Sequence, residues 1–167
     1  FNPPRYLRLL EIVADKEVDK AKIDLVAKFC DINLGKEVVV CNDTPGFIGN
    51  RIGTYWTLIG MVEALKLGLT VEEAAAVMGR PIGSPITGIF GLGDVVGLDL
   101  IPHVTESMSS NLPKSDMYNI GIKEQEKLGI DQILSKMISD GYTGRKGKGG
   151  FYRLSQDSGK RIKESRI

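Results

Sequence analysis

The sequence predicts a mainly helical fold that begins with a short strand–helix–strand unit. Two observations lead to this fold class. Apolar side chains recur at helical spacing after residue 42, whereas two short β-forming runs flank one amphipathic segment before it. The chain has 167 residues, 42% of them hydrophobic and 26% charged, with a net charge of +1. This composition is typical of a globular domain, and it excludes a disordered chain and nucleic-acid binding by bulk charge.

The first 41 residues predict a strand, a helix and a second strand. Residues 6–13 form an apolar run that ends in β-forming side chains, and the two prolines before it disfavour a helix. Residues 19–34 carry apolar side chains at helical spacing, and Gly35 stands where a helix C-cap is expected. Residues 37–41, Glu-Val-Val-Val-Cys, predict the second strand. One such unit indicates α/β structure but is too small to form a sheet domain.

The next two predicted helices have clear start signals. Residues 43–45, Asp-Thr-Pro, supply a cap and a proline for the first turn, and helical apolar spacing continues from there to Gly68. This is the strongest helical pattern in the chain. Thr70 and Glu73 have the spacing of a capping box, which predicts that a shorter helix begins directly after Thr70.

Glycine, proline and polar residues divide the rest of the chain. Residues 81–93 are rich in Gly and Pro and are interpreted as a connector. Asp94 is then expected to cap a helix that runs toward Met108. A last helix is expected over residues 130–139. Residues 153–167 are polar and charged, and they are expected to form a tail or linker.

Few side chains are available for metal binding or disulfides. The chain has two cysteines, Cys30 and Cys41, and one histidine, His103, which is interpreted as structural. These are too few for a disulfide framework, or for a four-ligand zinc site without unusual carboxylate ligands, so no metal is predicted. Reduced thiols favour a cytoplasmic location. The sequence shows neither an 18-residue apolar run nor a basic-then-apolar leader, so we expect no membrane span and no secretion signal.

Glu11 interrupts the apolar run of the first predicted strand. A carboxylate buried in a strand needs a hydrogen-bonding or cationic partner. One such arrangement is a carboxylate that orients a histidine, because it holds the tautomer and stabilises the imidazolium while the ring acts as a base. A solvent-facing glutamate on an edge strand is the alternative.

The predicted long helix carries several glycines together with Asn50. Each glycine inside a helix costs about 1 kcal/mol relative to alanine, so the close approach of another backbone or of a ligand is expected to offset this cost. Asn50 offers a ligand both a donor and an acceptor. Packing of one helix against another is the alternative explanation. The glycines are Gly46, Gly49, Gly53 and Gly60.

A basic, glycine-rich segment follows at residues 143–150. Arg145, Lys146 and Lys148 stand among glycines there, which suits binding of phosphate or carboxylate groups. A flexible linker is the alternative. The segment does not match a P-loop, because no Gly-Lys pair is followed by Ser or Thr. Residues 91–97 do not match the dinucleotide fingerprint, because their third glycine comes one residue late.

Five segments, in their order and spacing, resemble the 3-hydroxyacyl-CoA dehydrogenase family. The resemblance extends over nearly the whole chain to about Tyr152. Its most specific part is the combination of the Glu11 segment with the run Thr-Pro-Gly-Phe-Ile-x-Asn-Arg. The segments are Phe1-Asn2-Pro3, Leu9-Leu10-Glu11-Ile12-Val13, the run from Asp43 to Arg51, the run from Asp94 to Asp99, and the run from Gly144 to Tyr152.

The resemblance implies a fold, a reaction and partners. In this family a Rossmann domain binds NAD, a helical C-terminal domain mediates dimerisation, and acyl-CoA lies between them. The enzyme oxidises the 3-hydroxyl group to a ketone by hydride transfer, in fatty-acid β-oxidation. Residues 1–41 are therefore expected to be the terminal strand–helix–strand of a Rossmann domain. Residues 42–152 are expected to form a helical domain of the 6-phosphogluconate-dehydrogenase-like type that forms a homodimer.

The resemblance also implies roles for four residues. Glu11 matches a glutamate that orients the catalytic histidine, and Asn50 matches an asparagine that contacts the reacting end of the substrate. Asn2 and Lys146 match residues that approach the nicotinamide cofactor. The family histidine stands three residues before the position of Asn2, and the chain starts at Phe1 without an initiator Met, so we expect the chain alone to be inactive.

Two departures from the compact members resemble the large, multifunctional β-oxidation enzymes. Residues 83–94 are longer than in the short members, and residues 153–167 continue beyond the point where those members stop. A longer parent protein, with a fused enoyl-CoA hydratase module and a preference for longer acyl chains, is the corresponding expectation. Two alternatives remain: a non-catalytic helical assembly domain, and a related hydroxy-acid dehydrogenase that does not use CoA.

Overall fold

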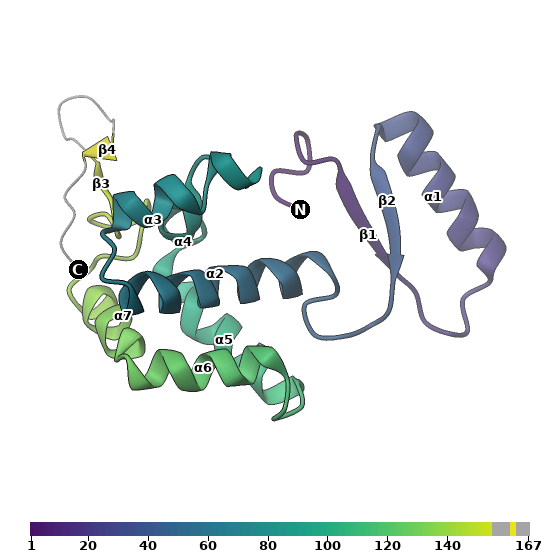
Figure 1. Cartoon of the computed structure of the whole chain (residues 1–167). Coiled ribbons are helices and arrows are strands. Elements are labelled where there is room, and N and C mark those ends of the chain that lie inside the picture. Colours follow the sequence, from purple (N-terminus) through teal and green to yellow (C-terminus); the bar gives the residue numbers. More distant parts are fainter. Residues whose placement is uncertain (155–160, 163–167) are drawn as a thin grey trace. The chain divides into compact units, whose positions relative to one another are not determined.

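The structure confirms the predicted strand–helix–strand unit. A computed structural model describes residues 1–154 and 161–162. β1 (Leu9–Val13) and β2 (Glu37–Cys41) pair in parallel, and α1 (Lys20–Leu34) connects them (Figure 1). Parallel neighbours require a crossover connection of this kind, so the local signals and the topology agree.

The chain divides into two compact units. The first is Phe1–Ile52 and the second is Gly53–Ile167. α2 (Gly49–Lys66) begins in the first unit and continues into the second.

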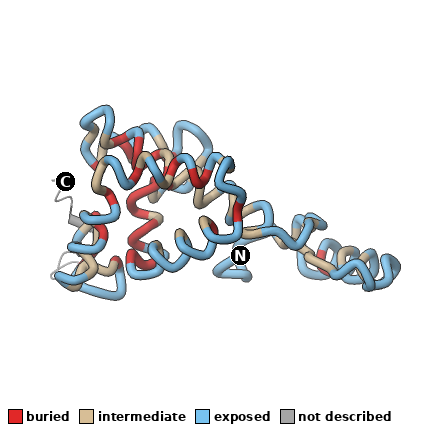
Figure 2. The backbone as a smooth tube through the Cα atoms, turned by 90° about the horizontal axis from the view of Figure 1, so that it is seen from below, coloured by how far each residue is buried: buried red, intermediate tan, exposed pale blue. Residues whose placement is uncertain are grey.

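The predicted C-cap Gly35 ends α1, and Asp19, which was not predicted as a cap, is its N-cap. The Asp19 carboxylate accepts a hydrogen bond from the amide of Ala21, and Gly35, at φ 63°, donates its N–H to Asp31. Cys30 is the buried residue of this helix. The first unit leaves much of its apolar surface exposed (Figure 2), as expected of one strand–helix–strand unit by itself. Exposed apolar residues of α1 and β2 include Leu25, Val26, Phe29, Ile32 and Val40.

The long helix begins later than the sequence predicts. Gly46 and Phe47 have φ values of 74° and 50°, in the left-handed region. The amide of Phe47 bonds to the carbonyl of Thr44, so the Asp-Thr-Pro segment belongs to a turn and not to the first helical turn. The helix therefore starts at Gly49.

The second unit is helical, which confirms the mainly α fold. α3 begins after Thr70, whose hydroxyl accepts from the amide of Glu73, while the Glu73 carboxylate accepts from the amide of Thr70. The predicted capping box and the predicted last helix are therefore both confirmed. The helices are α3 (Val71–Val77), α4 (Gly88–Val96), α5 (Ile101–Asn111), α6 (Met117–Lys127) and α7 (Ile130–Ser139), with single 3₁₀ turns at Arg80–Ile82 and Leu98–Leu100.

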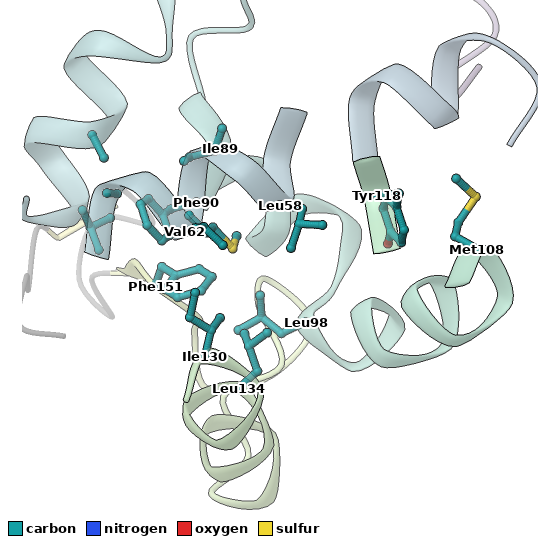
Figure 3. Packing of buried hydrophobic residues seen from close by; sticks show 14 of the residues in the cluster. Leu58, Val62, Ile89, Phe90, Leu98, Met108, Tyr118, Ile130, Leu134 and Phe151 are labelled. Atoms are coloured by element: carbon teal, nitrogen blue, oxygen red, sulfur yellow. The ribbon is translucent and has the colours of Figure 1, made fainter. Parts of the chain in front are cut away.

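The core of the second unit is formed by residues of α2 to α7, of the 3₁₀ turn at Leu98–Leu100 and of the segment at Phe151 (Figure 3). Phe90 and Phe151 pack edge to face, with ring centroids 4.8 Å apart. Val62 and Ile89 are fully buried beside them. The Phe151 side chain therefore packs the segment after α7 against the helices of the core.

The predicted connector at residues 81–93 is wrong, because a large part of it forms α4. Asp94 is not a cap but lies inside this helix. The glycines that made the segment look like a loop are packing positions. A Cβ on Gly88 would lie 2.9 Å from the Cβ of Ala75. Burial against α3 outweighs the low helix propensity of these glycines.

Two further stretches differ from the sequence prediction or extend it. α6 (Met117–Lys127) was not predicted. Near the end of the chain β3 (Arg153–Leu154) and β4 (Arg161–Ile162) pair antiparallel. These four residues belong to the predicted tail, and the rest of that tail lies outside the described residues.

In the described part of the chain no single helix has the length and hydropathy to cross a membrane. The pair Gly88–Val96 and Leu98–Asn111 passes that test only when taken together, and it is bent by 84°. Six of the nine residues of α4 are buried in the core.

Candidate functional site

Glu11 connects strand β1 to the start of helix α2. Its Oε1 atom accepts hydrogen bonds from the amides of Ile48 (3.0 Å) and Gly49 (2.6 Å). The first amides of a helix have no partner within the helix, and the helix dipole favours a negative charge there. Glu11 is half-buried, so it is not simply a solvent-facing side chain. Its partner in the structure is the start of a helix.

Only one of the two carboxylate oxygens of Glu11 is used in this way. Within the described residues no hydrogen bond is formed to Oε2. An ionised carboxylate accepts hydrogen bonds through both oxygens. The arrangement can therefore hold the carboxylate through Oε1 and still accept a donor at Oε2.

Cys41 lies close enough to Glu11 for the carboxylate charge to act on its thiol. Burial raises the pKa of Cys41, and the negative charge of Glu11 raises this pKa further. The Cys41 Sγ atom is 3.8 Å from the carbonyl oxygen of Ile12. These effects keep the thiol protonated at neutral pH, so Cys41 is not suited to act as a nucleophile.

Two other predicted site residues belong to the same unit. Asn50 follows Gly49 directly, in the first turn of α2, and it is exposed. Asn2 is exposed and follows Phe1, whose ring lies against Gly49: a Cβ on Gly49 would be 3.1 Å from Cε1 of Phe1. The structure therefore places Asn50 and the Asn2 segment around the same helix start that Glu11 caps.

The glycines of α2 have different surroundings. Gly49 lies against the side chains of Phe1 and Glu11, and not against the second backbone or the ligand that the sequence predicts. A Cβ on Gly60 would lie 2.9 Å from Cδ1 of Ile89 in α4, so packing of one helix against another explains this glycine.

Lys146 belongs to the second unit and lies on the basic loop, which we define as residues 143–150. The loop closes through a 2.8 Å hydrogen bond from the amide of Gly144 to the carbonyl of Gly149. Lys148 donates from Nζ to the carbonyl of Asp140 (3.0 Å) at the end of α7. Such a hydrogen-bonded backbone disagrees with the flexible-linker interpretation. Arg145 and Lys146 are exposed, so these two cations remain available to an anion.

Sequence reasoning missed the residue that holds this loop. Asp94 is buried in α4, with 4% of its surface exposed, and its carboxylate accepts from the amides of Phe151 and Tyr152. An acidic residue in the apolar run Gly-Ile-Phe-Gly-Leu-Gly-Asp-Val-Val was the available signal. Its place after a Gly- and Pro-rich stretch predicts a helix cap, whereas its hydrogen-bond partners lie 57 and 58 positions away in the sequence.

The two units offer different groups to a ligand. Among the described residues no group of three or more His, Cys, Asp or Glu side chains could hold a metal. His103, the single histidine, is exposed on α5. The first unit offers a carboxylate held at a helix start and a neighbouring amide side chain, and the second unit separately offers exposed cations on a closed loop.

Residues 46–154 match the family model described as "3-hydroxyacyl-CoA dehydrogenase, C-terminal domain". The chain belongs to this family. Its relatives include a Rickettsia prowazekii protein named "Putative fatty acid oxidation complex trifunctional enzyme". The two are 42% identical over 164 residues, which is 98% of this chain and 22% of the relative. A Bacillus subtilis protein named "Probable 3-hydroxyacyl-CoA dehydrogenase" is 40% identical over 92% of this chain and 18% of its own length.

A solved structure shares the fold of this 3-hydroxyacyl-CoA dehydrogenase C-terminal domain. (S)-3-hydroxybutyryl-CoA dehydrogenase PaaH1 from Ralstonia eutropha matches with a TM-score of 0.72 at 26% identity. The match covers 93% of this chain and 50% of the crystallised chain. The chain thus spans about half of that protein and about a fifth of the two sequence relatives.

Proposed function

We propose that this chain supplies the substrate-facing and dimerisation helices of an NAD-dependent 3-hydroxyacyl-CoA dehydrogenase. Such an enzyme oxidises 3-hydroxyacyl-CoA to 3-ketoacyl-CoA in fatty-acid β-oxidation. Family membership supports the reaction class. The observation that carries the proposal for this chain is the pair of hydrogen bonds from Ile48 and Gly49 to Glu11, which holds a carboxylate next to Asn50.

In this proposal Glu11 orients a histidine that comes from the residues of the longer protein. Oε1 stays on the helix amides, and Oε2 accepts the N–H of the imidazole. The ring nitrogen on the other side then takes the proton of the 3-hydroxyl group. The carboxylate holds the required tautomer and stabilises the imidazolium that forms. General-base catalysis of this kind is worth about 10²–10⁴-fold in rate.

Asn50 contacts the reacting end of the substrate in this proposal, because its side chain can donate to and accept from the oxygen on C3. Asn2 and Lys146 contact the cofactor. NAD, when bound, supplies the acceptor for the hydride that leaves C3. The exposed charge of Lys146 suits the anionic phosphates of this cofactor.

The domain assignment, assembly and location are part of the same proposal. Residues 1–41 complete a Rossmann domain, residues 42–152 form the helical domain, and residues 153–167 lead out of it. The helical domain mediates a homodimer. The protein acts in the cytoplasm on acyl-CoA, without nucleic-acid or membrane partners.

The direct test is reduction of acetoacetyl-CoA by NADH, followed at 340 nm. A longer protein in which this chain follows a histidine-bearing Rossmann segment should turn over the thioester. The 167-residue chain alone should not. Turnover by the chain alone would contradict the assigned roles, because its one histidine, His103, is exposed on α5 and is not the proposed base.

The same assay separates the alternatives. A non-catalytic assembly domain predicts that Glu11 and Asn50 can be replaced in the longer protein with little kinetic effect. A hydroxy-acid dehydrogenase that does not use CoA predicts activity on free 3-hydroxy acids and none on the thioesters. The close contact of Glu11 with the helix that bears Asn50 favours the CoA-dependent enzyme over the assembly domain.

A further inference from the structure

The carboxylate of Asp94 is the most deeply buried charge in the described part of the chain. It lies in α4, between apolar residues, with 4% of its surface exposed. Burying a carboxylate is costly unless hydrogen bonds replace its water shell. For Asp94 these bonds come from backbone amides directly after the basic loop.

Three hydrogen bonds join Asp94 to the two stems of the basic loop. Oδ1 accepts from the amide of Phe151 and Oδ2 from the amide of Tyr152, both at 2.8 Å. The backbone carbonyl of Asp94 accepts from the amide of Arg145 at 2.9 Å. One residue of α4 therefore holds the loop where it leaves and where it returns.

Two loop glycines permit this close approach. Gly144 has a φ of 95°, and a Cβ there would lie 2.5 Å from the carbonyl oxygen of Asp94. A Cβ on Gly150 would overlap the carboxylate itself. Any side chain at either position would push the loop away from Asp94. The two glycines and the carboxylate are therefore needed together to hold the loop.

The held loop presents Arg145 and Lys146 to solvent, while Lys148 is occupied at the carbonyl of Asp140. A cation on a fixed backbone loses less conformational freedom when it binds an anion than one on a mobile backbone. The affinity that Arg145 and Lys146 can give to an anion therefore depends on the group that fixes the loop.

We propose that Asp94 is a positioning residue that fixes the basic loop so that Lys146 meets the anionic cofactor. This inference rests on the proposed function for the role of Lys146, but the anchoring of the loop does not. An aspartate is required because two amides donate to it, one to each oxygen. In asparagine one of these oxygens would be replaced by an NH₂ group, which would face an amide N–H, donor against donor.

The first test measures the loop itself, in the 167-residue chain. In Asp94→Asn, hydrogen exchange at the amides of Phe151 and Tyr152, which bond to the carboxylate, should become about tenfold faster or more, while amides in the core of α2 keep their protection. Asp131→Asn is the matched control, because Asp131 is exposed in the first turn of α7. Unchanged exchange at these two amides would overturn the proposal.

A second variant covers the case in which Asp94→Asn does not fold. Gly150→Ala leaves the carboxylate in place and pushes the loop away from it. Circular dichroism checks that the helices remain. The same faster exchange at the loop amides is expected, and slow exchange in folded Gly150→Ala would count against the anchor.

The second test uses the complete dehydrogenase and asks whether Asp94 acts through Lys146. Asp94→Asn should raise the KM for NADH about tenfold while kcat changes less than about twofold. Lys146→Met should have a similar effect. In the Lys146→Met background, Asp94→Asn should add less than about twofold, because its target is already gone. A full tenfold addition there would overturn the proposal.

The two tests separate the failure of this inference from the failure of the proposed function. If the complete protein shows no dehydrogenase activity, the proposed function fails, and the exchange measurement still decides whether Asp94 anchors the loop. If exchange becomes faster but the KM for NADH does not depend on Lys146, the anchor exists without the cofactor role and the proposal is wrong.

Discussion

The amide of Gly49 donates a 2.6 Å hydrogen bond to Oε1 of Glu11, 38 residues earlier in the sequence. A carboxylate in the middle of a strand thus acts as the cap of a helix. Gly46 and Phe47, both with a positive φ, end the preceding turn. The helix then begins where the amides of Ile48 and Gly49 donate to Glu11.

The capping contact predicts different effects for two replacements of Glu11. Glu11→Ala removes the acceptor of two helix amides and should lower the free energy of unfolding by about 1–2 kcal/mol. Glu11→Gln keeps a side-chain oxygen at the same place and should lose about half of that or less. Urea unfolding followed by circular dichroism measures both. Glu106→Gln, exposed on α5, is the control, and equal losses in the two Glu11 variants would argue against capping.

The proposed catalytic role of Glu11 predicts a kinetic effect in the complete dehydrogenase. Glu11→Gln should lower kcat about 100-fold, because an uncharged amide does not stabilise an imidazolium, while KM changes less than about threefold. Steady-state assays with acetoacetyl-CoA measure both constants. An unchanged kcat would remove Glu11 from the mechanism and leave it as a helix cap.

The capping box at Thr70 predicts a pH-dependent contribution to stability. Hydrogen bonds from the backbone and side chain of Thr70 lower the pKa of Glu73 from its ordinary value of 4.5. Because the folded-state pKa is below the unfolded-state value, the contribution is complete above pH 4.5 and is lost as the pH falls through the lowered pKa. The unfolding free energy of the wild type minus that of Glu73→Gln should therefore shrink between pH 7 and about pH 3. A constant difference would contradict this linkage.

Replacing the hydroxyl of Thr70 tests the same cap without changing a charge. Thr70→Ala should lower the free energy of unfolding by about 1 kcal/mol at pH 7, whereas Thr70→Ser should preserve most of it. Thermal unfolding of the three chains at one protein concentration provides the comparison. Equal melting temperatures for all three would show that this N-cap contributes nothing to stability.

Two glycines of α2 should respond in opposite ways to alanine. Gly53 has no described atom within 4 Å of an added Cβ, so Gly53→Ala should stabilise the chain by about 0.5–1 kcal/mol through helix propensity. Gly60 faces the fully buried Ile89, and Gly60→Ala should destabilise the chain by about 1–3 kcal/mol through overpacking. Chemical unfolding of both variants gives the sign. Stabilisation by Gly60→Ala would mean that Ile89 repacks without cost.

The sequence by itself determined the elements whose signals are local. The C-cap at Gly35, the capping box at Thr70 and the helix at residues 130–139 depend on neighbours within a few positions, and the structure confirms them. The family was recognisable for a similar reason, because its motifs are short continuous runs. The roles of Asn2, Glu11, Asn50 and Lys146 in catalysis and cofactor binding stay predictions.

Only the tertiary structure decided what the long-range contacts do. A glycine-rich stretch forms α4 because α3 and the core pack against its glycines. The free energy gained by this burial outweighs the low helix propensity of glycine. Asp94 met its partners 57 and 58 positions later, and Glu11 met Gly49 38 positions later. No local pattern encodes such pairs, since a carboxylate in an apolar run shows only that a donor is needed. The folded chain determines which donor it finds.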